Sequence, residues 1–133
     1  ILVIDNNEAA LQTLRDRQIP FLFGDASSSV VLEKANLHLA RAMAIALPDP
    51  MATRLTLQRA LSLVPDLDIT VRAHVNEEID TLYQLGAQEV VQPEFEAALE
   101  MGAHMLLKMG DTAYTVQQVV NRYRSGRYRD ILP

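Results

Sequence analysis

Short apolar runs alternate along the chain with segments whose apolar residues recur at helical spacing. A continuous apolar run bounded by turn residues is typical of a parallel strand that is covered on both faces. Segments in which apolar residues return every three or four positions predict helices. The predicted strands cover residues 1–4, 21–23, 42–47, 69–73 and 89–91, and the predicted helices cover residues 8–17, 30–34, 51–64, 76–85, 93–109 and 114–123.

Several residues mark where the predicted helices begin and end. The polar run at residues 5–7 offers a side-chain cap to the first helix, and the serines at residues 27–29 offer one to the second. Gly86 stands where a helix ends in a left-handed residue, and Pro93 suits the first position of the following helix.

Strands separated by single helices predict an α/β fold with a parallel sheet and helices on both of its faces. This is the doubly wound, Rossmann-like arrangement, in which ligands bind at the carboxyl ends of the strands. Those ends are residues 5–6, 24–27, 47–49, 72–74 and 92–94.

The composition narrows the function classes. The 133 residues are 49% hydrophobic and 22% charged, which is typical of one folded domain with its own core. Twelve basic against 17 acidic residues give a net charge of −5, which argues against nucleic-acid binding. There are no cysteines, and the three histidines lack the spacing of metal ligands, so no metal site is predicted. The longest apolar stretch, residues 42–47, is far shorter than the roughly 20 residues of a membrane span.

The first residue is Ile1, and it already belongs to an apolar run that reads as a buried strand. A domain rarely begins inside its own core. We therefore expect the chain to be a piece of a longer protein.

Three positions at the predicted strand ends are candidates for binding. Asp5 can accept hydrogen bonds from both ribose hydroxyls of an adenine nucleotide, or it can cap the next helix. The Gly24-Asp25-Ala26 turn would let a flat adenine ring approach the backbone, or it is a turn before a serine cap. Arg72 needs an anion, or it pairs with Glu77 or Glu78.

No set of residues is arranged for catalysis. There is no convincing Ser/His/Asp order, and no carboxylate pair lies next to a plausible base. A soluble NAD-dependent oxidoreductase would need a substrate domain with a catalytic acid or base, which this sequence does not contain. The residues favour binding over turnover, so the chain is not expected to be an enzyme.

The beginning of the chain resembles a response-regulator receiver. A receiver needs an acidic pair after its first strand, a phospho-acceptor Asp that ends its third strand, and a Lys before a Pro. In this sequence the pair is Asp5-Asn6, Asp49 lies beyond Pro48, and Gln92 stands at the Lys position. A receiver-like signalling module would therefore act by protein contact, without phosphotransfer.

Four blocks, in the right order, resemble the TrkA-N domain, also called the regulator of potassium conductance (RCK) domain, and its Kef-type cation:proton antiporter branch. Residues 3–6 resemble the family's second strand with its ribose-binding acid, and residues 23–27 resemble its adenine-side turn. Residues 44–50 resemble the strand and loop of the antiporter branch, and residues 71–100 resemble the remainder. The resemblance implies a TrkA-N domain over residues 1–110, followed by a C-terminal helical segment and basic tail over residues 111–133.

The family opens with a strand and a glycine-rich loop that holds a pyrophosphate at a helix N-terminus. This chain begins at what would be the second strand, and it contains no Gly-x-Gly-x-x-Gly motif. In the usual strand order, the absent strand lies between the strands at residues 1–4 and 42–47. We therefore expect a break within the sheet, and phosphate binding that depends on a further segment.

The resemblance implies a regulatory domain at the cytoplasmic face of the cell membrane that binds NAD(H) or another adenine nucleotide. It would gate a potassium or sodium/proton antiporter, or a related potassium transport system. The implied partners are a second copy, in a homodimer or higher ring, and a membrane-embedded transporter in the same or a partner chain. The implied nucleotide-binding residues are Asp5, Asn6, Gly24, Asp25, Ala26, Ser27, Leu47, Pro48, Asp49 and Arg72, and the implied interface residues are Phe95, Leu99, Gly102 and Leu106.

Overall fold

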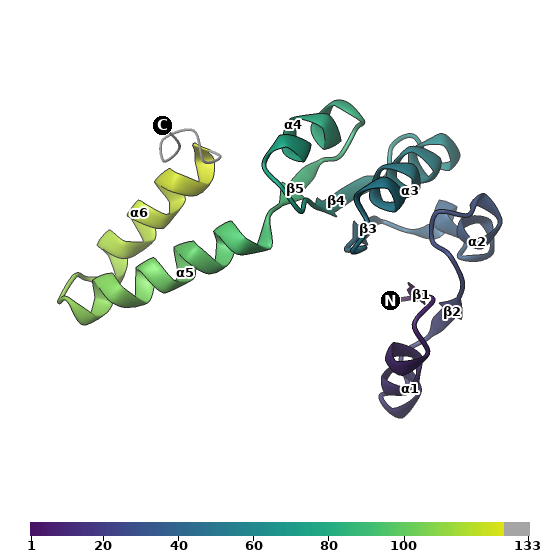
Figure 1. Cartoon of the computed structure of the whole chain (residues 1–133), viewed down its shortest axis with the longest axis horizontal. Coiled ribbons are helices and arrows are strands. Elements are labelled where there is room, and N and C mark those ends of the chain that lie inside the picture. The colour runs from purple at the N-terminus through teal and green to yellow at the C-terminus, as the bar shows by residue number, and fades with distance from the viewer. Residues whose placement is uncertain (127–133) are drawn as a thin grey trace. The chain divides into compact units, whose positions relative to one another are not determined.

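The structure is a computed structural model, and it describes residues 1–126 of the chain (Figure 1). The chain divides into two compact units, Ile1–Gln92 and Pro93–Pro133. Helix α5 (Pro93–Lys108) packs along helix α6 (Ala113–Ser125), so both helices belong to the second unit. A boundary of the family domain at residue 110 stays a prediction.

The first unit is built from alternating strands and helices, as the apolar pattern predicts. Each predicted strand is present: β2 and β5 have the predicted bounds, and the ends of the other strands are displaced by at most two residues. A short 3₁₀-helix, η1, was not predicted. In chain order the elements are β1 (Val3–Asp5), α1 (Glu8–Asp16), β2 (Phe21–Phe23), α2 (Ser29–Lys34), η1 (Leu37–Leu39), β3 (Ala42–Ile45), α3 (Pro50–Leu63), β4 (Asp68–Arg72), α4 (Glu77–Gln84) and β5 (Glu89–Val91).

All strand pairs among the described residues are parallel, which confirms the predicted Rossmann-like α/β class. The strands form two sheets, one with the order β1-β2 and one with the order β3-β4-β5. The sheet is therefore divided between β1 and β3, which is where the resemblance places the absent strand.

The free edges of the two sheets differ. The Val3 amide donates to the Pro20 carbonyl (3.0 Å) and the Gly24 amide donates to the Asp5 carbonyl (3.1 Å), so Val3 and Asp5 face β2. Backbone groups alternate along a strand, so the peptide groups of Ile4 point to the opposite, unpaired edge. At the outer edge of β5, by contrast, the Tyr83 hydroxyl accepts a hydrogen bond from the Val90 amide (3.1 Å). A side chain closes the β5 edge, whereas the β1 edge is open to a further strand.

The core of the first unit lies between the β3-β4-β5 sheet and the helices that cover it. Ile69 and Val71 of β4 are completely buried, as is Leu57 of α3. Thr53 and Thr56 of α3 are also buried, and their hydroxyls donate to the carbonyls of Asp49 (2.8 Å) and Ala52 (2.7 Å). These bonds satisfy the hydroxyls inside the core, so the helix can turn a face that includes threonine toward the sheet.

The predicted helix ends at Asn7, Gly86 and Pro93 are confirmed, whereas the predicted serine cap of α2 is not, because Ser28 is its N-cap but makes no side-chain cap bond. The Asn7 side chain caps α1 by accepting from the Ala9 amide (2.9 Å), and Asp49 caps α3. Pro93 is the first residue of α5. Gly86 follows α4 with a φ of +110°, the left-handed conformation in which glycine is favoured.

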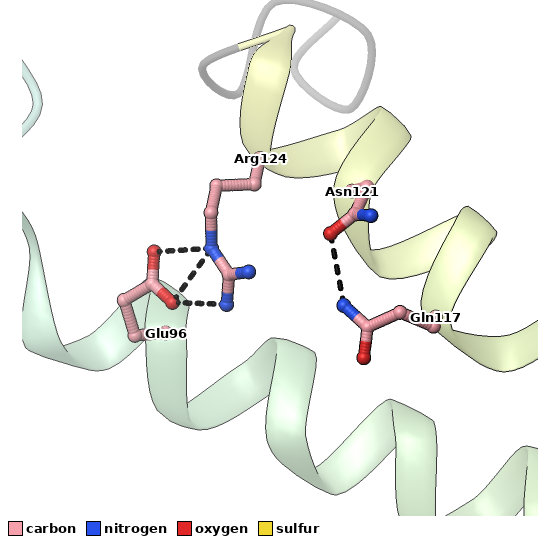
Figure 2. A network of polar contacts seen from close by, with 4 residues as sticks. All are labelled: Glu96, Gln117, Asn121 and Arg124. Atoms are coloured by element: carbon pink, nitrogen blue, oxygen red, sulfur yellow. Dashed lines mark hydrogen bonds and ion pairs between the residues drawn. The ribbon is translucent and has the colours of Figure 1, made fainter. Parts of the chain in front are cut away.

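The second unit is a helical hairpin. Its two helices are joined through Gly110, whose φ is +98°. Figure 2 shows the Arg124 guanidinium of α6 against the Glu96 carboxylate of α5, with Nη2 2.7 Å from Oε2 and Nε 3.2 Å from the same oxygen. No residue of α5 is buried, and the large hydrophobic side chains exposed on it are Met101, Met105 and Leu107.

Two further observations concern residues 1–126. None of their helices combines the length and the apolar character that crossing a membrane requires. In the same range, no three acidic or histidine side chains are grouped so that they could hold a metal ion. The predicted basic tail begins inside α6, and its residues from 127 onward lie outside the described part of the chain.

Candidate functional site

Asp5 ends strand β1 at the carboxyl edge of the β1-β2 sheet, where ligands bind in open α/β folds. Its side chain is half-buried, and its Oδ1 accepts a hydrogen bond from the Asn7 amide (2.8 Å). Its Oδ2 has no hydrogen-bond partner among residues 1–126. Asp5 thus contributes to the turn before α1 and keeps one carboxylate oxygen for another donor. Asn6, beside it, is exposed.

Gly24 lies directly beside Asp5, because its amide donates to the Asp5 carbonyl. A Cβ added to Gly24 would lie 2.9 Å from Cγ2 of Val31, closer than such atoms approach. The glycine is therefore needed because helix α2 comes close to the turn. The sequence explained Gly24 by the turn alone.

The Asp25 carboxylate is engaged within its own turn. Its Oδ1 accepts from the Ser27 amide (2.8 Å) and from the Ser27 hydroxyl (2.7 Å). These bonds to Ser27 hold the pKa of Asp25 below its ordinary value, and the Arg59 guanidinium lowers it further. Arg59 of α3 also donates to the Ser27 carbonyl, so the buried Ser27 joins the turn to α3. Asp25 shapes the turn, and half-buried Ala26 lies between it and Ser27.

Residues 47–49 follow strand β3. The Leu47 carbonyl lies 2.7 Å from Nε2 of His74, which follows β4. Exposed Asp49 is the N-cap of α3, because its Oδ2 accepts from the Ala52 amide (3.0 Å). Pro48, also exposed, lies between them.

Arg72 ends strand β4, and its Nε is buried without a hydrogen-bond partner in the described part of the chain. The alternative partners were Glu77 and Glu78, but neither pairs with Arg72. The Glu78 carboxylate instead lies 4.0 Å from the Arg54 guanidinium and accepts from the His74 amide (3.3 Å). A buried guanidinium nitrogen without a partner is costly, so this position favours an anion.

The structure thus brings the predicted residues together in two groups. Asp5, Gly24, Asp25 and Ser27 gather where β1 and β2 end. Leu47, Pro48 and Asp49 follow β3, and Arg72 ends β4, its neighbour in the sheet. Arg59 links the groups, because it extends from α3 to Ser27 and α3 begins after Asp49.

Two residues of this arrangement were not predicted. Arg59 was not considered, although it lies between buried Thr56 and Ala60 on the face of α3 that packs inward. No role was predicted for His74 beyond the absence of a metal site at the histidines. The sequence carried no local signal for its bond to Leu47, because the two residues are 27 positions apart.

A groove of about 410 Å³ lies elsewhere, along one face of α1 and beside β2. It is lined by Glu8, Leu11, Gln12, Arg15 and Phe23. No predicted nucleotide-binding residue lines it.

The implied interface residues lie on α5. Phe95, Leu99 and Leu106 are half-buried, and Gly102 is exposed. A Cβ added to Gly102 would meet nothing within 4 Å. The packing among residues 1–126 therefore gives no reason for a glycine at this position.

Comparison with known proteins identifies the family. The profile of the TrkA-N domain matches residues 1–93. The chain belongs to the TrkA-N domain family. The match confirms the resemblance drawn from the four blocks and favours it over the receiver.

Individual relatives agree with the Kef-type branch. The putative K(+) efflux antiporter KefB of Alkalimonas amylolytica is 31% identical over 126 residues, which are 95% of this chain and 19% of that protein. The chain spans about a fifth of the length of such curated relatives.

Solved structures share the fold. The Shewanella denitrificans Kef CTD in its AMP-bound form is 18% identical, with a TM-score of 0.72, and the match covers 93% of this chain and 90% of that one. The GsuK channel bound to NAD is 22% identical, with a TM-score of 0.61, and the match covers 81% of this chain and 23% of the channel.

Proposed function

We propose that this TrkA-N domain binds an adenine nucleotide and regulates a potassium or sodium/proton antiporter, or a related potassium transport system. The observation that carries the proposal is the Asp5 carboxylate at the end of β1. One of its oxygens is used by the turn and the other is free to accept from a ribose hydroxyl. An acid in this position is what a dinucleotide-binding fold uses to hold ribose.

The other nucleotide contacts follow from the geometry of the strand ends. Asp25 already bonds to Ser27, so the adenine would pack on the backbone of the Gly24–Ala26 turn rather than on a free carboxylate. The guanidinium of Arg72, with its unpartnered Nε, would hold a phosphate or another anionic effector. Residues 47–49 would line the site between these contacts.

The relatives support the choice of ligand and of partner. The similar Kef CTD is described with AMP bound, and the similar GsuK channel with NAD bound. KefB is a putative potassium efflux antiporter. A domain of this kind would lie at the cytoplasmic face of the membrane, beside or attached to the transporter. It would act by binding rather than by catalysis.

Regulation would run through differential binding. A nucleotide can shift an equilibrium between two arrangements only if it binds them with different affinity. A dimer or higher ring supplies such arrangements, and α5 is our candidate for its interface. Its exposed methionines and Gly102 suit a surface on which a second helix approaches closely.

Calorimetric titration with AMP, on a protein that also carries the family's first strand and glycine-rich loop, tests the ribose contact. Asp5→Ala should weaken binding by about 1–3 kcal/mol, because ribose hydroxyls would lose their acceptor. Asp66→Ala removes an exposed acidic residue in the turn before β4, outside the site, and controls for the change in net charge. Equal affinity in the Asp5→Ala and Asp66→Ala variants would exclude Asp5 from the site.

Light scattering across a concentration series tests the interface. Leu106→Glu should shift the assembly toward monomer because it buries a charge in the interface. Gly102→Leu should do the same because its side chain blocks the close approach of a second helix. Met51→Glu, which places the same charge on an exposed apolar position of α3, is the control. An assembly that survives both α5 changes would place the interface elsewhere.

A further inference from the structure

Residues 46–48, which connect β3 to α3, have few means of attachment to the rest of the unit. Pro48 and Pro50 carry no backbone N–H, so two donors that could anchor this loop are absent. Within the described part of the chain, Asp49 bonds only to residues 52 and 53 of its own helix. Among residues 1–126, the contact between the Leu47 carbonyl and the His74 ring is the one hydrogen bond that joins residues 46–48 to another segment.

The chemistry of the two groups fixes which one donates the hydrogen bond. A carbonyl oxygen only accepts, so Nε2 of His74 carries the proton and donates it to Leu47. At 2.7 Å the bond is short for an N–H donor and a carbonyl. The imidazole ring of His74 therefore joins the residues that follow β4 to the residues that follow β3.

The backbone of His74 is itself held in place by a hydrogen bond. The backbone amide of His74 donates to the Glu78 carboxylate (3.3 Å), and Glu78 is buried in the first turn of α4. The Arg54 guanidinium of α3 lies 4.0 Å from the same carboxylate. Glu78 thus fixes the backbone of His74. The negative charge of Glu78 lies near Arg54 and the N-terminus of α4.

We propose that His74 is a positioning residue for nucleotide binding, which holds residues 47–49 at the carboxyl edge of β3 by its bond to Leu47. The inference rests on the proposed nucleotide site, since these residues matter for affinity only if they line it. His74 would not touch the nucleotide. It would reduce the number of conformations that the loop loses when the ligand binds.

Three variants separate this role from simple packing. His74→Ala removes the donor, and His74→Asn keeps a polar side chain that is too short to extend to Leu47. His74→Gln places an amide donor at about the distance of Nε2. Tyr83→Phe is the control, because it removes a side-chain bond to a strand amide at the β5 edge, away from the proposed site.

Two measurements on the protein give the answer. Without nucleotide, amide hydrogen exchange of residues 46, 47, 49 and 51 should become several-fold faster in the Ala and Asn variants and return to the wild-type rate in the Gln variant. With AMP as the ligand, affinity should fall about three- to tenfold in the Ala and Asn variants, as expected for one lost hydrogen bond. It should be restored by Gln and unchanged in Tyr83→Phe.

The failures are distinguishable. If the unaltered protein binds AMP and His74→Ala or His74→Asn binds it equally well, His74 has no positioning role and the proposed function stands. Failure of the Gln variant to restore affinity would also overturn the role. If the unaltered protein binds no AMP even with the family's first strand and glycine-rich loop present, the proposed function falls, and this inference falls with it.

Discussion

Gly86 and Leu61 are so close that a Cβ added to Gly86 would lie 2.6 Å from Cδ1 of Leu61. Gly86 also has a φ of +110°, so two independent constraints require glycine at the end of α4. The steric constraint arises from the close approach of α3 to the end of α4. The conformational constraint arises from the backbone of Gly86 alone.

Gly86→Ala should therefore lower the free energy of unfolding by about 1 kcal/mol through the backbone, and by less through crowding, because Cδ1 is the end of a flexible leucine side chain that can move. In a Leu61→Ala background the crowding part should disappear and the backbone part remain. Gly102→Ala, which meets nothing within 4 Å inside a helix, is the control and should be neutral or slightly stabilising. Urea unfolding of the four proteins measures these differences, and equal losses in both backgrounds would contradict the steric part.

Asp25 contributes to the decrease in the free energy of unfolding at low pH. Its folded-state pKa lies below the ordinary 3.8 because Ser27 donates two hydrogen bonds to it. A lowered folded-state pKa stabilises the folded protein fully above pH 3.8, and this contribution is lost as the pH falls through the folded-state value. Asp25→Asn should therefore lose less stability than the wild type when the pH is lowered below 3.8.

Ser27→Ala supplies the matched test of the cause. Without the hydroxyl donor, the pKa of Asp25 should move back toward its ordinary value, which a ¹³C carboxyl titration measures directly. Because the carboxylate is exposed, the effect on stability should be small, and the titration is the more sensitive measurement. An unchanged Asp25 titration in Ser27→Ala would assign the shift to another cause.

In the second unit, the ion pair between Glu96 and Arg124 joins α5 to α6, as Figure 2 shows. Both side chains are partly exposed, so the coupling energy from a double-mutant cycle of Glu96→Ala and Arg124→Ala should be about 0.2–1 kcal/mol. It should decrease in 1 M salt, where the Debye length is about 3 Å.

The neighbouring Gln117–Asn121 pair is the control for this cycle. Its side chains are joined by an uncharged hydrogen bond (2.9 Å) within α6. A cycle of Gln117→Ala and Asn121→Ala should give a coupling that is nearly independent of salt. Salt-independent coupling in the charged pair as well would show that the attraction is not Coulombic.

The order and type of the elements could be predicted from sequence because they depend on local periodicity. The strand ends could not, because they depend on partners. The apolar run begins at Ile1, yet Ile1 is fully exposed and pairing starts only where the Val3 amide meets the carbonyl of Pro20. The length of β1 is thus set by β2, which its own residues do not encode.

The site was predictable in position but not in its bonds. Residues at strand ends could be identified because parallel strands end at one edge. The partners of Glu78 could not, because Arg54 lies 24 positions earlier and the one partner considered for Glu78, as an alternative, was the nearer Arg72. The need for a glycine at residue 24 was recognised, but its cause is Val31 on the following helix. In each case a contact between elements decided the outcome.

Gly24 connects the packing of α2 to the nucleotide site, since it contacts Val31 on one side and bonds to Asp5 on the other. Gly24→Ala must displace either α2 or the turn. We expect a loss of about 1–3 kcal/mol in the free energy of unfolding, together with weaker AMP binding, because the turn beside Asp5 would move. Val31→Ala in the same chain removes the clashing methyl groups and should restore much of the affinity, although it leaves a small cavity of its own. Calorimetry and urea unfolding on the single and double variants separate the two effects. Reduced stability of Gly24→Ala with unchanged AMP affinity would mean that the turn does not contact the nucleotide.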